Sequence, residues 1–200
     1  MKVLGIVGLP GSGKGELSKI ADQMHIPVVV MGDVIREEVQ KAGFPPTGEN
    51  MGIISRALRE RDGMAAIAIA CIPVVERLES ELVLIDGLRG DAEVRVLQKH
   101  FSNFVLIAVT APDEMRFARL CSRKRSDDMS SFADLHERDA REVSFGLLNA
   151  MEMADIRIEN VTDIETFKRD VISVLNTLRI QQIEQIDQIE QINCTDGDVP

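Results

Sequence analysis

The clearest chemical signature in the chain lies near its start, in a segment with the residue types that bind phosphate. The run Gly8-Leu9-Pro10-Gly11-Ser12-Gly13-Lys14-Gly15 fits the pattern G-x-x-x-x-G-K, in which backbone N–H groups surround phosphates and the lysine reaches the outer ones. The apolar run Val3–Val7 precedes this loop, and apolar residues recur at helical spacing after it. Such a strand–loop–helix order sets the positive end of a helix beside the anion. We therefore predict that residues 8–15 bind the phosphates of a nucleotide.

Charged residues follow two further apolar runs that read as strands. Asp86 follows the run Leu82–Ile85, and a carboxylate that closes a buried strand beside a phosphate loop can hold the water shell of magnesium. After the run Pro27–Met31, Asp33 and Arg36 lie one helical turn apart. Two structural explanations stay open, because Asp86 could cap a helix and Asp33 could form an ordinary salt bridge with Arg36. We favour a functional role for all three.

A cluster of basic residues predicts a further contact with an anion. Between residues 116 and 125 the chain has five bases and no acid, namely Arg116, Arg119, Arg123, Lys124 and Arg125. Arg119 and Arg123 are four residues apart and so share one face of a helix, where like charges repel. An anion bound between them explains this pair more easily than stability does. The alternative is a polar helix held by salt bridges, because five acidic residues lie between 127 and 139.

These side chains need a sheet to position them, and the order of apolar runs indicates its kind. Five runs read as buried strands, at Val3–Val7, Pro27–Met31, Leu82–Ile85, Phe104–Val109 and Asp155–Glu159. Segments with helical spacing separate them, and this alternation indicates a parallel sheet covered by helices on both faces. We expect the site at the carboxyl edge of that sheet. Asp163 is predicted to cap the last helix.

Composition limits the kinds of partner. The 200-residue chain has 23 Lys and Arg against 33 Asp and Glu, a formal net charge of -10 that argues against nucleic acid or an anionic membrane as partner. Trp and Tyr are absent, so a platform for base stacking is not expected. The longest apolar run, Met64 to Val75, is too short to span a membrane. Three distant cysteines form neither a disulfide framework nor a zinc cluster, and we expect a cytoplasmic protein.

The last twenty residues differ in composition from the rest. Residues 181–200 contain five acids and no Lys or Arg, and isoleucine recurs at every third position from Ile180 to Ile192. On an α-helix a three-residue step rotates the side chain by about -60°, so these isoleucines do not stay on one face. A partner-binding helix is the alternative to the solvated extension that we favour. We therefore expect a nucleotide kinase-like domain over residues 1–180 and an acidic low-complexity tail over 181–200.

Four of these segments, in this order, resemble those of the adenylate-kinase-like nucleoside monophosphate kinases. The loop at residues 8–15 looks like their glycine-rich loop, residues 31–36 resemble their Thr-Gly-Asp-x-x-Arg acceptor motif, and Ile85–Arg89 resembles Asp-Gly-Phe-Pro-Arg. Residues 119–123 and 125–128 look like the edges of a lid of which most is missing. Ala154–Asn160 instead resembles the Ala-Asp-x-x-Ile-x-Asn segment of dephospho-coenzyme A kinases. Over residues 1–180 the pattern is most similar to a largely archaeal family of adenylate-kinase-related P-loop proteins.

The resemblance implies a three-layer α/β P-loop fold with five parallel strands in the order 2-3-1-4-5, a short helical lid and acceptor-binding helices. It also implies ATP and Mg²⁺ as ligands. In the loop, Gly8, Leu9, Pro10, Gly11, Ser12, Gly13, Lys14 and Gly15 would hold the donor phosphates. Asp86 would orient magnesium waters, and Arg119 would lie against adenine. Arg36 and Arg89, near Asp33, would clamp the acceptor phosphate, Arg138 would be a further lid arginine, and Arg123 and Arg125 would meet the charge on the transferred group.

By this resemblance, the reaction is transfer of the γ-phosphoryl group of ATP to a small phosphorylated acceptor, for which we favour a nucleoside monophosphate. A second interpretation is an alcohol kinase of the dephospho-coenzyme A kinase type, in which Asp33 would act as the base. A third is an ATP-gated interaction protein with slow ATPase activity. Two positions depart from the adenylate-kinase pattern, because Glu16 and Met31 stand where that family has threonine.

Overall fold

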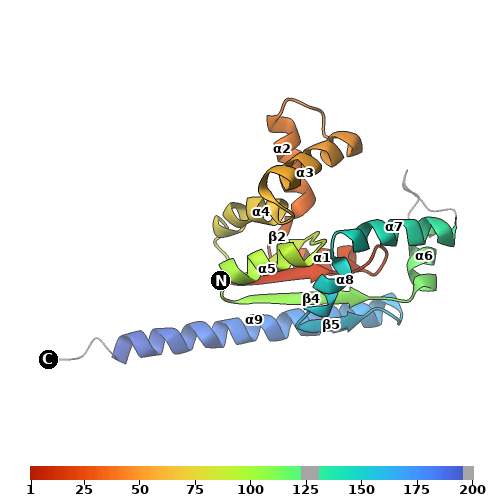
Figure 1. The fold of residues 1–200 in the computed structure, drawn as a ribbon. Helices are drawn as coiled ribbons and strands as arrows, with labels where there is room; N and C mark the ends of the chain where they lie inside the picture. Colours follow the sequence, from red (N-terminus) through yellow and green to blue (C-terminus); the bar gives the residue numbers. More distant parts are fainter. Residues whose placement is uncertain (123–130, 196–200) are drawn as a thin grey trace.

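The computed structural model describes residues 1–122 and 131–195, with side chains as far as residue 184, and its centre is a five-stranded parallel sheet (Figure 1). The strands are β1 (Lys2–Val7), β2 (Val28–Val30), β3 (Leu82–Asp86), β4 (Phe104–Thr110) and β5 (Ile156–Glu159). They lie in the order β2-β3-β1-β4-β5, and all the pairings are parallel. The predicted α/β class and strand order are confirmed.

The strands supply two hydrophobic cores because successive residues of a strand point to opposite faces of the sheet. In β1, Val3 and Val7 lie in one core, and Leu4 and Ile6 lie in the other. All four side chains are fully buried. A parallel sheet that is covered on both faces requires such continuous apolar strands, which is why the sequence predicts them as runs without polar alternation.

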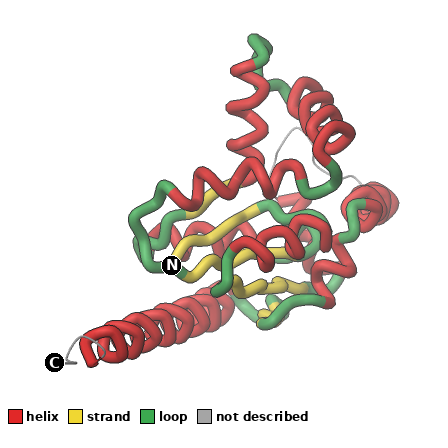
Figure 2. The backbone as a smooth tube through the Cα atoms, turned by 60° about the vertical axis from the view of Figure 1, so that its left-hand side comes forward, coloured by secondary structure: helices red, strands yellow, loops and turns green. Residues whose placement is uncertain are grey.

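Helices cover both faces of the sheet and make the molecule three-layered (Figures 1 and 2). On one face lie α4 (Ala66–Glu76), α5 (Asp91–His100) and α8 (Leu147–Glu152), and on the other lie α1 (Lys14–Gln23) and α9 (Ile164–Thr195). Two helices, α6 (Asp113–Ser122) and α7 (Phe132–Ser144), follow β4 at one end of the sheet. Within the described part of the chain, no helix has the length and apolar character that crossing a membrane requires.

Two further helices stand away from the sheet, and we call them the arm. They are α2 (Met31–Lys41) and α3 (Gly48–Asp62), and Figures 1 and 2 both show them projecting above the sheet. Met31, Val34 and Val39 anchor α2 in the core. In contrast, α3 buries none of its residues, although a helix of a globular protein usually buries an apolar stripe. It is therefore positioned by its neighbours α2 and α4 and has no core of its own.

Several element boundaries near the site differ from the prediction by one or two residues. The sequence predicts a second strand over Pro27–Met31, but β2 spans only Val28–Val30, because it is an edge strand that pairs with β3 alone. The following helix consequently begins at Met31, earlier than the start near Asp33 that the apolar spacing predicts. Asp86 lies inside β3 and not after it, since its backbone continues the ladder with both neighbouring strands.

The last helix runs without a break through the boundary expected at residue 180. As predicted, Asp163 caps it, since its carboxylate accepts hydrogen bonds of 3.0 and 2.9 Å from two backbone N–H groups of the first turn. Near the other end, Nδ2 of Asn103 donates to Oε1 of Gln182 at 2.6 Å. Gln182 is buried, so the contacts between α9 and the domain reach at least this residue.

Candidate active site

The predicted phosphate loop lies between β1 and α1 at the carboxyl edge of the sheet, and its fold requires three of its glycines. The φ angles of Gly8, Gly11 and Gly13 are 153°, 80° and 119°, in a region that favours glycine. A Cβ on Gly8 would lie 2.3 Å from the backbone oxygen of Val109, and one on Gly13 would lie 2.3 Å from Nδ2 of Asn160. The backbone therefore passes where no side chain fits.

Two side chains of the loop fit the phosphates of ATP. The hydroxyl of Ser12 is buried and has no hydrogen-bond partner among the described residues. The ammonium group of Lys14 donates to the loop's own backbone, at 3.2 Å from the oxygen of Leu9 and also to that of Gly8. A glycine cradle with an orphaned buried hydroxyl and a lysine supplies donors of the kind that bind phosphate oxygens.

Asn160, which directly follows β5, fixes this loop to α6. Its side chain is buried, with Nδ2 donating to the backbone oxygen of Ser12 at 2.8 Å and Oδ1 accepting from Nη2 of Arg119 at 2.9 Å. Arg119 also donates to the backbone oxygen of Asn160 at 3.1 Å. Arg119 therefore lies beside the loop, and the adenine contact that the resemblance implies for it stays a prediction.

Arg116 is a structural member of the basic cluster. Its side chain is 1% exposed, donates to the backbone oxygen of Pro10 at 3.0 Å, and forms ion pairs with Asp139 at 2.6 Å and Asp113 at 2.8 Å. The hydrogen bond from Arg116 holds the pKa of Asp113 below its ordinary value. For Arg116 the salt-bridge interpretation is therefore correct. Arg123 and Arg125 lie outside the described residues.

Asp86 lies across from α1, with its carboxylate held by a serine that the phosphate-loop pattern does not include. Ser18 Oγ donates to Asp86 Oδ2 at 2.8 Å. Gly15, directly after Lys14, has no hydroxyl, and Ser18 supplies one from the next helical turn. Among the described residues, no group of three or more His, Cys, Asp or Glu could hold a metal ion directly. Magnesium, which usually keeps several waters, would fit here through water on Asp86 and through phosphate oxygens.

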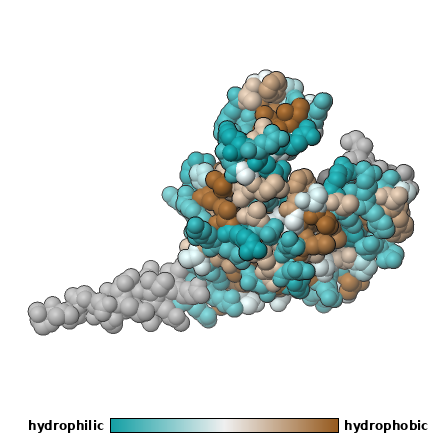
Figure 3. Space-filling model, viewed as in Figure 1, coloured by the Kyte–Doolittle hydropathy of each residue, from teal (hydrophilic) through white to brown (hydrophobic). Residues whose placement is uncertain are grey.

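Two cavities meet beside Asp86. The phosphate-loop cavity has a volume of about 870 Å³ and is lined by the loop, Arg119 and Thr162. The arm cavity has a volume of about 1240 Å³ and lies between the arm and α7, where Figure 3 shows this face of the molecule hollowed. Five lining residues belong to both, namely Asp86, Gly87, Arg89, Arg138 and Glu142. Ligands in the two cavities would meet at this shared wall.

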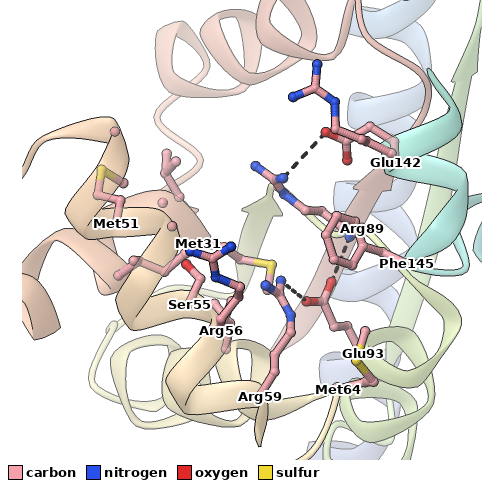
Figure 4. A pocket seen from close by; sticks show the side chains of 18 of the residues that line it. Met31, Met51, Ser55, Arg56, Arg59, Met64, Arg89, Glu93, Glu142 and Phe145 are labelled. Carbon is pink, nitrogen blue, oxygen red and sulfur yellow. Dashed lines mark hydrogen bonds and ion pairs between the residues drawn. The ribbon is translucent and has the colours of Figure 1, made fainter. Parts of the chain in front are cut away.

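A buried carboxylate organises the arm cavity (Figure 4). Glu93 is 2% exposed, and it accepts from the backbone N–H of Arg89 at 2.7 Å and from Nη2 of Arg59 at 3.5 Å. The guanidinium of Arg59 lies 5.1 Å from the ring centroid of Phe145, and that of Arg89 lies 3.4 Å from Glu142. Burial raises the pKa of Glu93. This cluster therefore joins the arm, the edge of the sheet and α7.

Two of the predicted acceptor residues lie outside both cavities. Asp33 and Arg36 form an ion pair with each other, and their side chains are 57% and 46% exposed. Neither is among the described residues that line a cavity. The structure brings Arg89 and Arg138 to the shared wall, and it adds Arg56 of α3 to the arm cavity.

Four of these residues have no role that was predicted from the sequence, namely Ser18, Arg56, Arg59 and Glu93. Spacing could have indicated the first three, because Ser18 lies four residues after Lys14 and the two arginines lie three residues apart, each pair on one helical face. Glu93 has no such signal. Its partners come from two other segments of the chain, and only the folded structure brings them together.

The chain matches known proteins over most of its length. The family model described as an AAA domain (AAA_17) matches residues 7–136. A UPF0200 protein from Methanoregula boonei is 54% identical over 177 residues, which make up 88% of this chain and 97% of that protein. The chain belongs to the UPF0200 family. Another UPF0200 protein, from Pyrococcus horikoshii, is 39% identical over 175 residues, with 86% of this chain and 94% of the relative covered. The resemblance to a largely archaeal P-loop family is thereby confirmed.

Solved structures share the fold of this UPF0200 chain. Shikimate kinase from Bacteroides thetaiotaomicron has a TM-score of 0.62 at 13% identity, with 89% of this chain and 98% of that chain covered. TT1252 from Thermus thermophilus has a TM-score of 0.61 at 19% identity, with 88% and 97% covered. A gluconokinase from Sinorhizobium meliloti 1021 has a TM-score of 0.53 at 15% identity, with 92% and 97% covered. At such identities the likeness shows the fold alone, which is that of the P-loop kinases.

Proposed function

We propose that this protein is a phosphotransferase that moves the γ-phosphoryl group of ATP to a small acceptor bound in the arm cavity. The observation that carries the proposal is the wall that the two cavities share. Asp86, Arg89 and Arg138 lie on it, so the outer phosphate of the donor and the acceptor would meet beside one carboxylate and two guanidinium groups. Phosphoryl transfer depends on positioning and on neutralisation of charge, and this wall supports both.

The residues around the wall have different roles in the reaction. The glycine loop and Lys14 hold the triphosphate, and Ser18 orients Asp86. Magnesium, held through water by Asp86, supplies neutralisation of the phosphate charge when it is bound. The bond from the γ-phosphorus to the bridging oxygen breaks and leaves its electron pair on ADP, while an acceptor oxygen forms the new bond. Arg89 and Arg138, on the wall between the two cavities, stabilise the negative charge of both the transferred group and the acceptor.

We favour a phosphorylated acceptor, and among these a nucleoside monophosphate. A phosphate monoester has a second pKa of about 6, so at neutral pH it is largely ionised and needs cations to hold it, not a base. The arm cavity offers Arg56, Arg89 and Arg138 for that purpose. Asp33, the candidate base for an alcohol, faces solvent and pairs with Arg36.

An alcohol kinase is the second candidate. Its support is the likeness in fold to proteins named shikimate kinase and gluconokinase. Asp86 and Glu142 on the shared wall are carboxylates that could accept the proton of an alcohol. This candidate therefore differs from the first in requiring a base and not a phosphate clamp.

A panel of acceptors tests the proposal. The release of ADP from ATP and magnesium is measured with nucleoside monophosphates, with small alcohols that carry no phosphate, and with no acceptor. We expect one or more monophosphates to stimulate ADP release and to be recovered as diphosphates, and we expect Lys14→Ala to lower both at ATP concentrations that do not saturate the variant. Stimulation by alcohols alone selects the second candidate. Turnover that only a macromolecule stimulates contradicts both and selects the ATP-gated interaction protein.

A further inference from the structure

We propose that Arg56, on α3, holds the phosphate group of the acceptor together with Arg89, and that Arg36 takes no part. This inference rests on the proposed function and deepens it, because it locates the anion-binding group of the acceptor site. It departs from the resemblance of residues 31–36 to the adenylate-kinase acceptor motif, which assigns the role to Arg36. Three observations support it: which arginines already form ion pairs, how Arg59 anchors α3, and the open space beside the glycines of that helix.

The arginines of the arm differ in what they already bind. Arg36 forms an ion pair with Asp33 and is not among the residues that line the arm cavity. Arg59 lines the cavity, but its charge is balanced by Glu93. Arg56 also lines the cavity, and it makes no hydrogen bond or ion pair with any residue in the described part of the chain. The charge of Arg56 is therefore left for a ligand, whereas Arg89, which pairs with Glu142 at 3.4 Å and is half exposed, would share its charge between that carboxylate and the ligand.

The helix that carries Arg56 is anchored beside it. Arg59 lies three residues further along, and its side chain is only 12% exposed where it contacts Glu93. The same carboxylate accepts a hydrogen bond of 2.7 Å from the backbone N–H of Arg89. One buried group thus fixes both the helix with Arg56 and the loop with Arg89, and Figure 4 shows both of these guanidinium groups among the side chains around the pocket.

The cavity side of α3 leaves room for the rest of the acceptor. Gly48 and Gly52 precede Arg56 by eight and four residues, so the three share one face of the helix. A Cβ added to either glycine would meet no heavy atom within 4 Å, and both glycines line the arm cavity. We therefore infer an organic phosphate whose phosphate group lies between Arg56 and Arg89 and whose remainder lies along the glycines.

Binding of inorganic phosphate to the nucleotide-loaded protein tests this inference. The protein is first saturated with magnesium and a non-hydrolysable ATP analogue, which occupies the phosphate loop, and phosphate is then titrated in a calorimeter. Arg56→Ala, Arg89→Ala and Arg36→Ala are compared, because each removes one positive charge and so changes the net charge equally. Arg56→Lys is the fourth variant, since lysine keeps the charge and loses the planar fork that matches phosphate.

We expect phosphate to bind Arg36→Ala as tightly as the wild-type protein, and to bind Arg56→Ala and Arg89→Ala at least about tenfold more weakly. Arg56→Lys should lie between these limits. An equal loss in Arg36→Ala and Arg56→Ala, or a wild-type protein that binds no phosphate, would overturn the inference. Failure of the ATP analogue to bind is seen before phosphate is added, and it would contradict the proposed function itself.

Discussion

Ser18 Oγ lies 2.8 Å from Oδ2 of Asp86, and this hydrogen bond joins the second turn of α1 to the end of β3. In the phosphate-loop pattern that has a hydroxyl directly after the lysine, that hydroxyl binds magnesium. Here Gly15 occupies that position, and the nearest hydroxyl on the helix reaches the carboxylate. Groups that orient a metal-binding side chain affect metal affinity without touching the metal. We therefore assign to Ser18 a role in positioning Asp86.

Replacement of Ser18 should weaken the magnesium-dependent part of ATP binding. Without its hydrogen bond, Asp86 is free to rotate away from the magnesium waters, and losses of an orienting group cost about 10- to 100-fold in metal affinity. Calorimetry of ATP binding to Ser18→Ala, with magnesium and with EDTA, measures the effect. Ser18→Thr keeps the hydroxyl and should bind like the wild-type protein. Equal loss with and without magnesium would contradict the assigned role.

Replacement of Lys14 should weaken ATP binding about ten- to a hundredfold, because a charge-assisted contact is worth about 1.5–3 kcal/mol. The fold should persist, since the hydrogen bonds of the Lys14 ammonium group to the backbone oxygens of Gly8 and Leu9 lie within its own loop and join no two elements of the core. Calorimetry compares Lys14→Ala with Lys41→Ala, which removes a lysine paired with Glu38 on α2, away from the residues that line either cavity. Unchanged affinity in Lys14→Ala would exclude the loop as a nucleotide site.

Glu93 should make the stability of the protein fall as the pH rises. Burial raises its pKa above the ordinary value of 4.5, so between these two values the folded state binds more protons than the unfolded state. The contribution of Glu93 to the free energy of unfolding is therefore fully present below its pKa in the unfolded state. It is lost as the pH rises through its pKa in the folded state. Glu93→Gln removes the titration. We expect the free energy of unfolding of the wild-type protein to decline relative to that of Glu93→Gln over this range.

Urea denaturation of the two proteins at a series of pH values measures this difference. The comparison cancels the titration of the groups that both proteins retain, provided that their unfolding is two-state. A difference that stays constant, or that moves in favour of the wild-type protein as the pH rises, would contradict a raised pKa of Glu93 in the folded state.

The end of α9 should divide at Gln182 into a part that stabilises the domain and a part that does not. Deletion of residues 183–200 should leave the melting temperature and the ATPase rate nearly unchanged, because isoleucines three residues apart cannot form one apolar face. Adding Gln182→Ala should cost about 0.5–1.5 kcal/mol, since the hydrogen bond from Nδ2 of Asn103 to Oε1 of Gln182 is lost. Calorimetric melting measures both. A lower melting temperature, or a new oligomeric state, after the deletion alone would mean that the tail packs.

The sheet could be predicted from the sequence because its signals are local. Each buried strand is an uninterrupted apolar run, and the glycine loop fixes the first strand and the first helix. The ends of β2 were the hardest to predict, because this edge strand pairs with β3 alone. The apolar run that predicts the strand also includes Met31, which is the first residue of α2. Order along the sheet came from the resemblance to adenylate-kinase-like proteins, and the pairings confirm it.

In the arm, the motif at residues 31–36 predicts that Asp33 and Arg36 face a ligand, but the helical period of α2 places them elsewhere. Met31, Val34 and Val39 are buried, so the helical period turns Asp33 and Arg36 toward solvent. The solvent-facing side of α2 can be predicted from the sequence once the first residue of the helix is known. The contact of Arg59 with Glu93 cannot be predicted in this way, because it joins side chains 34 residues apart on two helices. How these two helices pack is determined only by the folded chain.

Because α3 has no fully buried residue, the wall that it gives to the arm cavity can change without loss of the fold. Substitutions at sites that make no buried contact usually change stability by about 0.5 kcal/mol or less. Since α3 buries none of its residues fully, changes at its exposed positions fall in that class, whereas changes at partly buried ones such as Arg59 do not. Substitutions at those exposed positions can therefore change the surface that the arm cavity presents to its ligand at little cost to the stability of the sheet that carries the phosphate loop.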